Sequence, residues 1–257
     1  LIIGFQFVNP IANYFSNVQS NRFYISKYNN SWEEQWQKRY TESGSGLWIG
    51  ETFTTISSGT VTIPSANSTP GVNVYSTLDD GDHIYVAASP SNSVYKINKS
   101  DGAVANKTMF LRNASYRLAS PAQDGSGYEY TRYRMPQTII SHSSNNSGLL
   151  NCAFGHTVAC KLNKSDLSVS GSIRNSNTHF NGSTNHYSNV HARGIKDDPS
   201  NGDWYFLSQS QYFSLKGNTN YLLFTRMATD GTVTFRRYAE MNPFQGSAHA
   251  LAVDGTY

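Results

Sequence analysis

The sequence predicts an all-β protein, a β-propeller of four-stranded antiparallel blades, and two observations lead to this prediction. First, a basic residue recurs inside an apolar stretch that a polar run follows, and its spacings along the chain are 69, 65 and 65 residues. The four basic residues are Lys27, Lys96, Lys161 and Arg226. Second, strand-like stretches separated by turns rich in Asp, Asn, Ser and Gly surround each of them, without helical periodicity between. Hairpins that recur at such a period are typical of propeller blades.

Each repeat is predicted to be a meander of four strands. Around Lys96, the stretch 93–98 alternates its side chains between two faces and runs into the turn 99–102, after which a further strand follows. A hairpin spanning 74–88 precedes it and supplies the two inner strands. By the same pattern we expect repeats at about 1–48, 73–111, 137–173 and 191–238, with 248–257 beginning the next repeat or closing the ring.

Two parts of this pattern allow alternatives. Residues 32–40 contain Glu and Gln and resemble a helix, but their aromatic residues fall where the other repeats have an outer strand, so we expect a strand. The first repeat lacks an innermost strand, and 249–257 resembles one. We therefore expect a segment of a longer polypeptide. Its terminal strand either pairs with the first strand of the chain and closes a four-bladed ring, which would protect two sheet edges, or belongs to a ring with more blades.

The composition limits the partners that the chain can be expected to bind. Charged residues make up 14% of the chain, against roughly 25% in an average globular protein, and Asn, Ser, Thr and Tyr supply the polar surface instead. The net charge is +3 with no block of Lys or Arg, so we expect no nucleic-acid partner. No apolar run approaches the roughly 18 residues that span a bilayer, so we expect no membrane insertion. This composition suits a virion surface or an extracellular location.

A family resemblance follows from three stretches. Residues 23–38 resemble the first half of the repeat of bacterial and phage SBBP-type β-propellers, and 79–88 and 250–257 resemble its second half. Only the first copy keeps the Trp after the basic residue, and only the second and last keep Asp-Gly. The resemblance implies a propeller scaffold with a binding role and no catalytic residues. It implies a place among bacterial surface proteins or among the tail and fibre proteins of phage virions.

Several residues invite a metal or redox interpretation. His191 and His249 occupy matching places in innermost strands, where they could line a central channel, but hydrogen bonding across the channel is the simpler role. The acidic clusters 79–82 and 197–203 could bind Ca²⁺, yet they fall in hairpin turns where Asp and Gly are common. We therefore expect no metal and no cofactor. A two-residue turn at 155–156 would place Cys152 and Cys160 on opposite faces, which predicts free thiols; an odd-length turn would reverse this.

The sequence favours binding over catalysis. No Gly-x-Ser-x-Gly elbow occurs, the sialidase Asp-box is not reproduced at 100–102, and no pair of carboxylates stands out. Exposed rings beside planar polar groups suit sugar stacking, and the candidate contacts are Tyr128, Tyr130, Arg132 and Tyr187. These rings could equally pack on a blade.

The expected function is that of a non-enzymatic virion structural protein of a phage tail or tail fibre. It would bind other virion proteins within a larger assembly and act as an adhesin for host-surface glycans. A secreted or cell-surface polysaccharide-degrading enzyme and a bacterial cell-surface interaction module are the alternatives. The binding site is expected on the face that carries the insertions 49–73, 112–136 and 174–190, together with the long loops 8–21 and 208–220.

Overall fold

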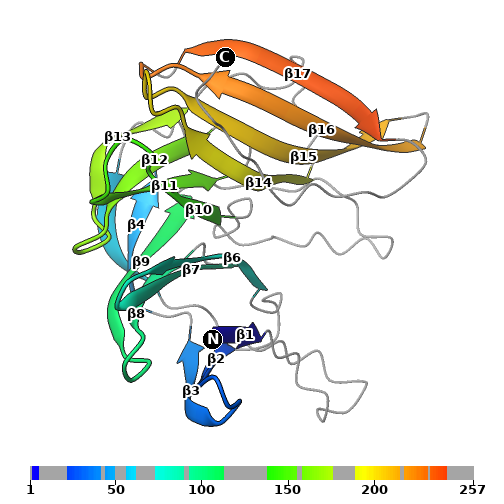
Figure 1. The fold of residues 1–257 in the computed structure, drawn as a ribbon. Helices are drawn as coiled ribbons and strands as arrows, with labels where there is room; N and C mark the ends of the chain where they lie inside the picture. The colour runs from blue at the N-terminus through cyan, green and yellow to red at the C-terminus, as the bar shows by residue number, and fades with distance from the viewer. Residues whose placement is uncertain are drawn as a thin grey trace.

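The structure, a computed structural model, is built from strands grouped into four sheets (Figure 1). It describes residues 2–5, 22–41, 44–49, 56–61, 73–89, 93–112, 138–154, 158–175, 189–214, 217–230 and 232–241. Within these ranges every regular element is a strand, and none is a helix long and apolar enough to cross a membrane. The prediction of an all-β protein is therefore confirmed for the described residues.

The first two sheets contain the first and second predicted repeats. The first sheet has the order β1 (Ile2–Phe5), β2 (Arg22–Tyr28), β3 (Glu34–Thr41). The second sheet contains β6 (Asn73–Asp80), β7 (His83–Ser89), β8 (Ser93–Asn98) and β9 (Val104–Arg112) as an antiparallel meander. The stretch that could be read as a helix is thus the strand β3.

The third and fourth sheets are complete four-stranded meanders, each in sequence order. The third consists of β10 (Thr138–His142), β11 (Leu149–Phe154), β12 (Val158–Asn163) and β13 (Val169–Asn175). The fourth consists of β14 (Asn189–Asp197), β15 (Trp204–Ser214), β16 (Gly217–Met227) and β17 (Val233–Met241). The second, third and fourth sheets each contain a four-stranded meander with the basic residue on its third strand, whereas the first sheet has three strands with Lys27 on β2.

Two predicted loops are in fact strands. Within and just before the predicted insertion 49–73, β4 (Gly44–Ile49) and β5 (Ile56–Val61) form a hairpin, and β4 pairs in parallel with β9. The hairpin extends the second sheet to six strands because β9 offers it an unpaired edge. The predicted loop 208–220 is also wrong, since β15 and β16 pair through this range up to Ser214 and Gly217.

The apolar core lies between successive sheets. In β7, consecutive side chains are all buried: Ile84, Val86 and Ala88 pack with the first sheet, whereas Tyr85 and Ala87 pack with the third. A strand that is buried on both faces reads as a continuous apolar run, which explains the sequence 84–88. A third cluster joins the third sheet to the fourth through Ile139, Ala153, Ala159, Ile195, Trp204, Phe206 and Met227.

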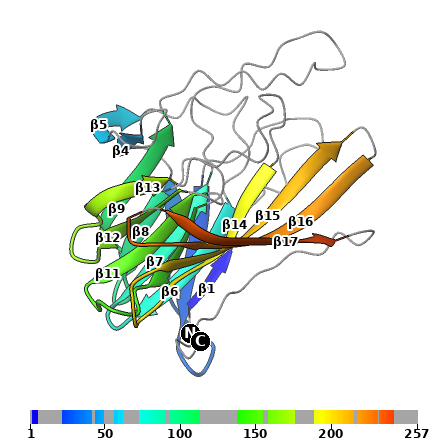
Figure 2. The same cartoon turned by 90° about the horizontal axis from the view of Figure 1, so that it is seen from above.

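The sheets therefore succeed one another in chain order, each covering the next (Figures 1 and 2). The first and fourth sheets lie at opposite ends of this series in Figure 1, and no core cluster of the described residues joins them. This arrangement of antiparallel sheets fits a propeller-like or a β-sandwich fold. Closure of a ring stays a prediction, because 249–257 lies outside the described residues.

Candidate functional site

The polar contacts between successive sheets follow one repeated plan, which is clearest in the second sheet. Tyr85, Lys96 and Asn106 lie side by side on three neighbouring strands. All three donate to backbone carbonyls in the turn of the third sheet that follows β12. Tyr85 Oη reaches the Lys164 oxygen at 3.2 Å, and Lys96 Nζ and Asn106 Nδ2 reach the Ser165 oxygen at 3.3 and 2.8 Å. We call such a set of aligned side chains a cross-strand row.

The first sheet carries the equivalent row. Lys27 lies opposite Trp36, and Lys27 Nζ and Trp36 Nε1 donate to the Lys99 carbonyl oxygen at 2.9 and 3.0 Å. This oxygen belongs to the turn that follows β8 of the second sheet. Tyr40, further along β3, donates through its hydroxyl to the Gly102 carbonyl in the same turn. Lys27 and Lys96, the basic residues that mark the first two repeats in the sequence, are thus side chains that reach the next sheet.

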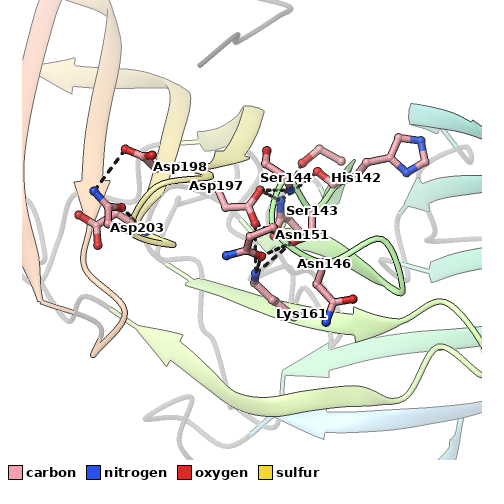
Figure 3. A network of polar contacts seen from close by, with 12 residues as sticks. His142, Ser143, Ser144, Asn146, Asn151, Lys161, Asp197, Asp198 and Asp203 are labelled. Carbon is pink, nitrogen blue, oxygen red and sulfur yellow. Dashed lines mark hydrogen bonds and ion pairs between the residues drawn. The ribbon is translucent and has the colours of Figure 1, made fainter. Parts of the chain in front are cut away.

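The third sheet directs its row at a carboxylate instead of a carbonyl (Figure 3). Asn151 lies opposite Lys161, and both contact Asp197 at the end of β14 in the fourth sheet. Asn151 Nδ2 donates to Oδ1 at 2.9 Å and Lys161 Nζ to Oδ2 at 3.1 Å. Ser143 Oγ donates to Oδ2 at 2.6 Å, and the Ser144 amide donates to Oδ1 at 2.7 Å.

Asp197 is ionised because of these four donors. Its side chain is fully buried, and burial alone would raise its pKa. The hydrogen bonds from Ser143, Ser144, Asn151 and Lys161 outweigh this effect and hold the pKa of the carboxyl well below its usual range. A buried carboxylate with both oxygens satisfied and a paired ammonium is a stable arrangement, and removing one partner would leave a costly charge.

The same cluster contains a serine, a lysine and an aspartate, the residue types of some nucleophilic sites. Ser143, however, donates to Asp197 and to Asn145, so its proton is shared between acceptors in the cluster. Lys161 donates to Ser143, Asn145 and Asp197 and has no lone pair to accept a proton while it is an ammonium. The geometry therefore supports a clamp between two sheets rather than a nucleophile and its base.

The acidic clusters proposed for Ca²⁺ are used in other contacts. Asp79 pairs with Lys99, and Asp80 pairs with Lys164 of the third sheet at 3.0 Å. Asp198 accepts from the Ser200 amide and hydroxyl, which hold its pKa below the ordinary value, and Asp203 pairs with Arg226. In the part of the chain that the structure describes, no group of three His, Cys, Asp or Glu is placed to hold a metal ion.

The two cysteines are free, as predicted, and both are buried, but the predicted register is wrong. Cys152 lies directly opposite Cys160, because three residues separate β11 from β12 instead of the two assumed. The side chains therefore share a face. Burial raises the pKa of the Cys152 thiol, and its hydrogen bond with Cys160 raises it further.

The structure does not describe the predicted binding residues. Tyr128, Tyr130, Arg132 and Tyr187 are outside the described residues, as is His249. His191 belongs to β14 and lies opposite Gln209, but its side chain is outside what the structure describes. The recurring basic residues served in the sequence only as position markers, and their contacts with the neighbouring sheet were not predicted. Their recurrence inside otherwise apolar strands was the available signal, since a charged residue placed there requires a partner.

Comparisons with known proteins leave the family open. No family model matches the chain, and no curated protein matches it. Among solved structures, the crystal structure of Saccharomyces cerevisiae Sqt1 is similar at 9% sequence identity and a TM-score of 0.33. The match covers 85% of this chain and 68% of that one, and a likeness of this degree carries no argument about function.

Proposed function

We propose that this chain is a non-enzymatic scaffold of the propeller type that presents a binding face, as a structural component of a phage tail or tail fibre. The expected ligand is a host-surface glycan, and the expected neighbours are other virion proteins. Two features support a scaffold. Apolar clusters fill the space between successive sheets. The most extensive polar network, around Asp197, serves to join the third sheet to the fourth.

The proposal of a binding face rests on where two kinds of chain segment lie. One kind is the turns that receive the cross-strand rows, and the other is the long insertions. In the second and third sheets, the turns that receive a cross-strand row follow the third strand of the meander and lie beside the turns that join the first and second strands. In the fourth sheet the acceptor, Asp197, ends the first strand, at the same edge. Lys99 N donates to the Asp82 oxygen, and Lys164 N donates to the Gly148 oxygen. In an antiparallel meander the other ends of the strands lie at the opposite edge.

That opposite edge borders the long insertions. β9 ends at Arg112 and β10 begins at Thr138, while β13 ends at Asn175 and β14 begins at Asn189. The insertions 112–136 and 174–190 therefore connect strand ends at the edge away from the turns that receive the cross-strand rows. The edge with the receiving turns makes the contacts between sheets. The opposite edge carries the insertions, which favours the insertion face as the binding face.

A glycan array combined with a reducing-end assay tests this function. We expect glycan binding without release of reducing ends. The variant Tyr130→Ala/Arg132→Ala should weaken binding by roughly 1–3 kcal/mol if these side chains are central contacts, with an unchanged melting temperature. Val104→Ser, which alters an exposed apolar residue at the start of β9, is the control for a merely altered surface. Release of product that a single carboxylate substitution abolishes would instead identify a polysaccharide-degrading enzyme.

A further inference from the structure

The fourth sheet carries a cross-strand row without a sheet to receive it among the described residues. Tyr205, Arg226 and Phe235 lie side by side on β15, β16 and β17, just as Tyr85, Lys96 and Asn106 do in the second sheet. Arg226 pairs with Asp203 of its own sheet, with Nη2 at 2.6 Å from Oδ2. The other three sheets use the same row to reach a neighbour.

The face that holds this row is aromatic and basic. Tyr205 stacks on Phe224 with ring centroids 5.7 Å apart, and Phe224 meets the edge of Phe235 at 5.9 Å. The guanidinium of Arg226 lies 5.7 Å from the Tyr205 ring, and that of Arg237 lies 4.8 Å from the Phe235 ring. Phe235 is 36% exposed, a large fraction for a phenylalanine. We call these five residues the fourth-sheet face.

At the other end of the series lies the turn 29–33, because no sheet of the described residues precedes the first. Three turns have corresponding hydrogen bonds, although the first is one residue shorter: the amides of Trp32, Gly102 and Leu167 donate to the carbonyls of Asn29, Asn98 and Asn163. In each turn the amide of that asparagine donates to the carbonyl of the residue that follows the first donor. All three donor residues have positive φ, at 62°, 71° and 60°. Trp32, Gly102 and Leu167 are therefore structurally equivalent.

The environments of these three residues differ in one respect. Leu167 is 1% exposed and packs in the core cluster shared with the second sheet. Gly102 lies against Trp36 and Lys38 of the first sheet, where an added Cβ would come within 2.8 Å of the indole ring. Trp32, in contrast, is 66% exposed. Trp32 is thus exposed to solvent at the position where the second and third sheets place Gly102 and Leu167 against the preceding sheet.

We propose that the fourth-sheet face of one copy of this chain binds the turn 29–33 of a second copy. Arg237 follows Phe235 by two residues on β17, as Lys38 follows Trp36 on β3. Because Lys38 lies against Gly102, the equivalent Arg237 would lie against Trp32 and next to the exposed Glu33. The basic-aromatic face and the turn with its tryptophan and carboxylate are then complementary in shape and charge.

A second copy fits this role because the two surfaces of a single copy lie at opposite ends of the series of sheets (Figure 1). Two different patches on each copy make a head-to-tail contact, which either closes into a ring of copies or extends into a filament. The contact would continue the stacking of sheets from one copy to the next.

The test uses two one-sided variants of the full chain. Trp32→Ala removes the turn's anchor, and Phe235→Ser/Arg237→Glu removes the fourth-sheet face. Val104→Ser is the matched control, because Val104 is also an exposed apolar residue, at 45%, and belongs to neither surface. Light scattering after size exclusion measures the mass across a wide range of concentration, and circular dichroism checks folding. We expect association of the unmodified chain and of the control, and a single-chain mass of 28.5 kDa for each one-sided variant.

Mixing the two one-sided variants provides the decisive comparison. The Trp32→Ala variant keeps the fourth-sheet face, and the Phe235→Ser/Arg237→Glu variant keeps the turn 29–33. One contact can form between them, so the mixture should form a dimer and nothing larger. The charge exchange Glu33→Lys/Arg237→Glu, made in one chain, should restore association that Arg237→Glu alone weakens. The proposal would be overturned if the unmodified chain had a single-chain mass at every concentration. Ring closure within one chain would produce that result. Association that neither one-sided variant reduces would also overturn it.

Discussion

The Tyr40 hydroxyl donates to the Gly102 carbonyl oxygen over 2.8 Å and joins β3 of the first sheet to a turn of the second. Burial of the ring and the nearby charge of Asp101 raise the pKa of Tyr40 well above its usual range, so the hydroxyl is protonated and can donate at neutral pH. The contact is one of a series, because each of the first three sheets places polar side chains against the next sheet.

Replacing Gly102 by alanine should destabilise the protein more than the same change at Gly81. Both glycines have positive φ, 71° and 58°, so both substitutions carry backbone strain, about 1–2 kcal/mol. At Gly102 the new Cβ would also lie 2.7 Å from Lys38 Cγ, whereas at Gly81 it meets nothing within 4 Å. Overpacking should therefore add roughly 1–3 kcal/mol at Gly102 alone. Denaturant unfolding of both variants measures the difference; equal losses would show that the two sheets are not in close contact there.

The change Tyr40→Phe should lower the free energy of unfolding by about 1 kcal/mol, since it leaves the ring in place and removes one buried hydrogen bond. Tyr28→Phe is the control, because the contact of the Tyr28 hydroxyl with Glu34 is exposed and long, at 3.5 Å. Thermal and denaturant unfolding should show a smaller loss for the control. A loss at Tyr28 as large as that at Tyr40 would contradict the contact between sheets.

Asp197 should make stability depend on pH in the acid range. Its pKa is lowered in the folded protein, against about 3.9 in an unfolded chain. The stabilisation is therefore complete above the unfolded value and is lost as the pH falls below about 4 towards the folded pKa. Unfolding measured at a series of pH values should show this loss, and Asp197→Asn should remove this part of the acid dependence. An acid dependence unchanged by the substitution would be inconsistent with an ionised, hydrogen-bonded carboxylate.

The cysteine pair should resist thiol reagents in the native state. Both thiols are buried, and burial together with the Cys152–Cys160 hydrogen bond raises the pKa of Cys152, which keeps the reactive thiolate scarce. Titration with a coloured disulfide reagent should detect the two thiols only after a denaturant is added. Rapid modification of the folded chain would indicate that the interface between the second and third sheets opens readily.

Much of this architecture could be predicted from the sequence because local signals agree with it. Turns such as Ser100-Asp101-Gly102 and the buried run 84–88 identify strands and their ends without any tertiary information. The hairpin β4–β5 was missed because it forms on an edge that β9 supplies, a long-range contact. The register of Cys152 with Cys160 was missed because one extra residue in a turn moves a side chain to the other face.

The contacts of the site were harder to foresee. The sequence shows that Lys27, Lys96 and Lys161 recur, but it does not show that their partners differ. Two of them bind backbone carbonyls, which every residue provides, and the third binds Asp197. A carbonyl acceptor leaves no mark in the amino-acid sequence. The exposed position of Trp32 is likewise visible only when the turns 29–33, 99–103 and 164–168 are aligned in space.

A double-mutant cycle on Lys161 and Asp197 tests most directly whether a cross-strand row joins one sheet to the next. Lys161→Met alone leaves the buried carboxylate without its cation and should cost about 3 kcal/mol. In Lys161→Met/Asp197→Leu both charges are gone, so the loss should be smaller than the sum of the two single losses, with a coupling energy of at least about 1 kcal/mol. Losses that simply add would contradict the contact between the third and fourth sheets and the repeated plan built on it.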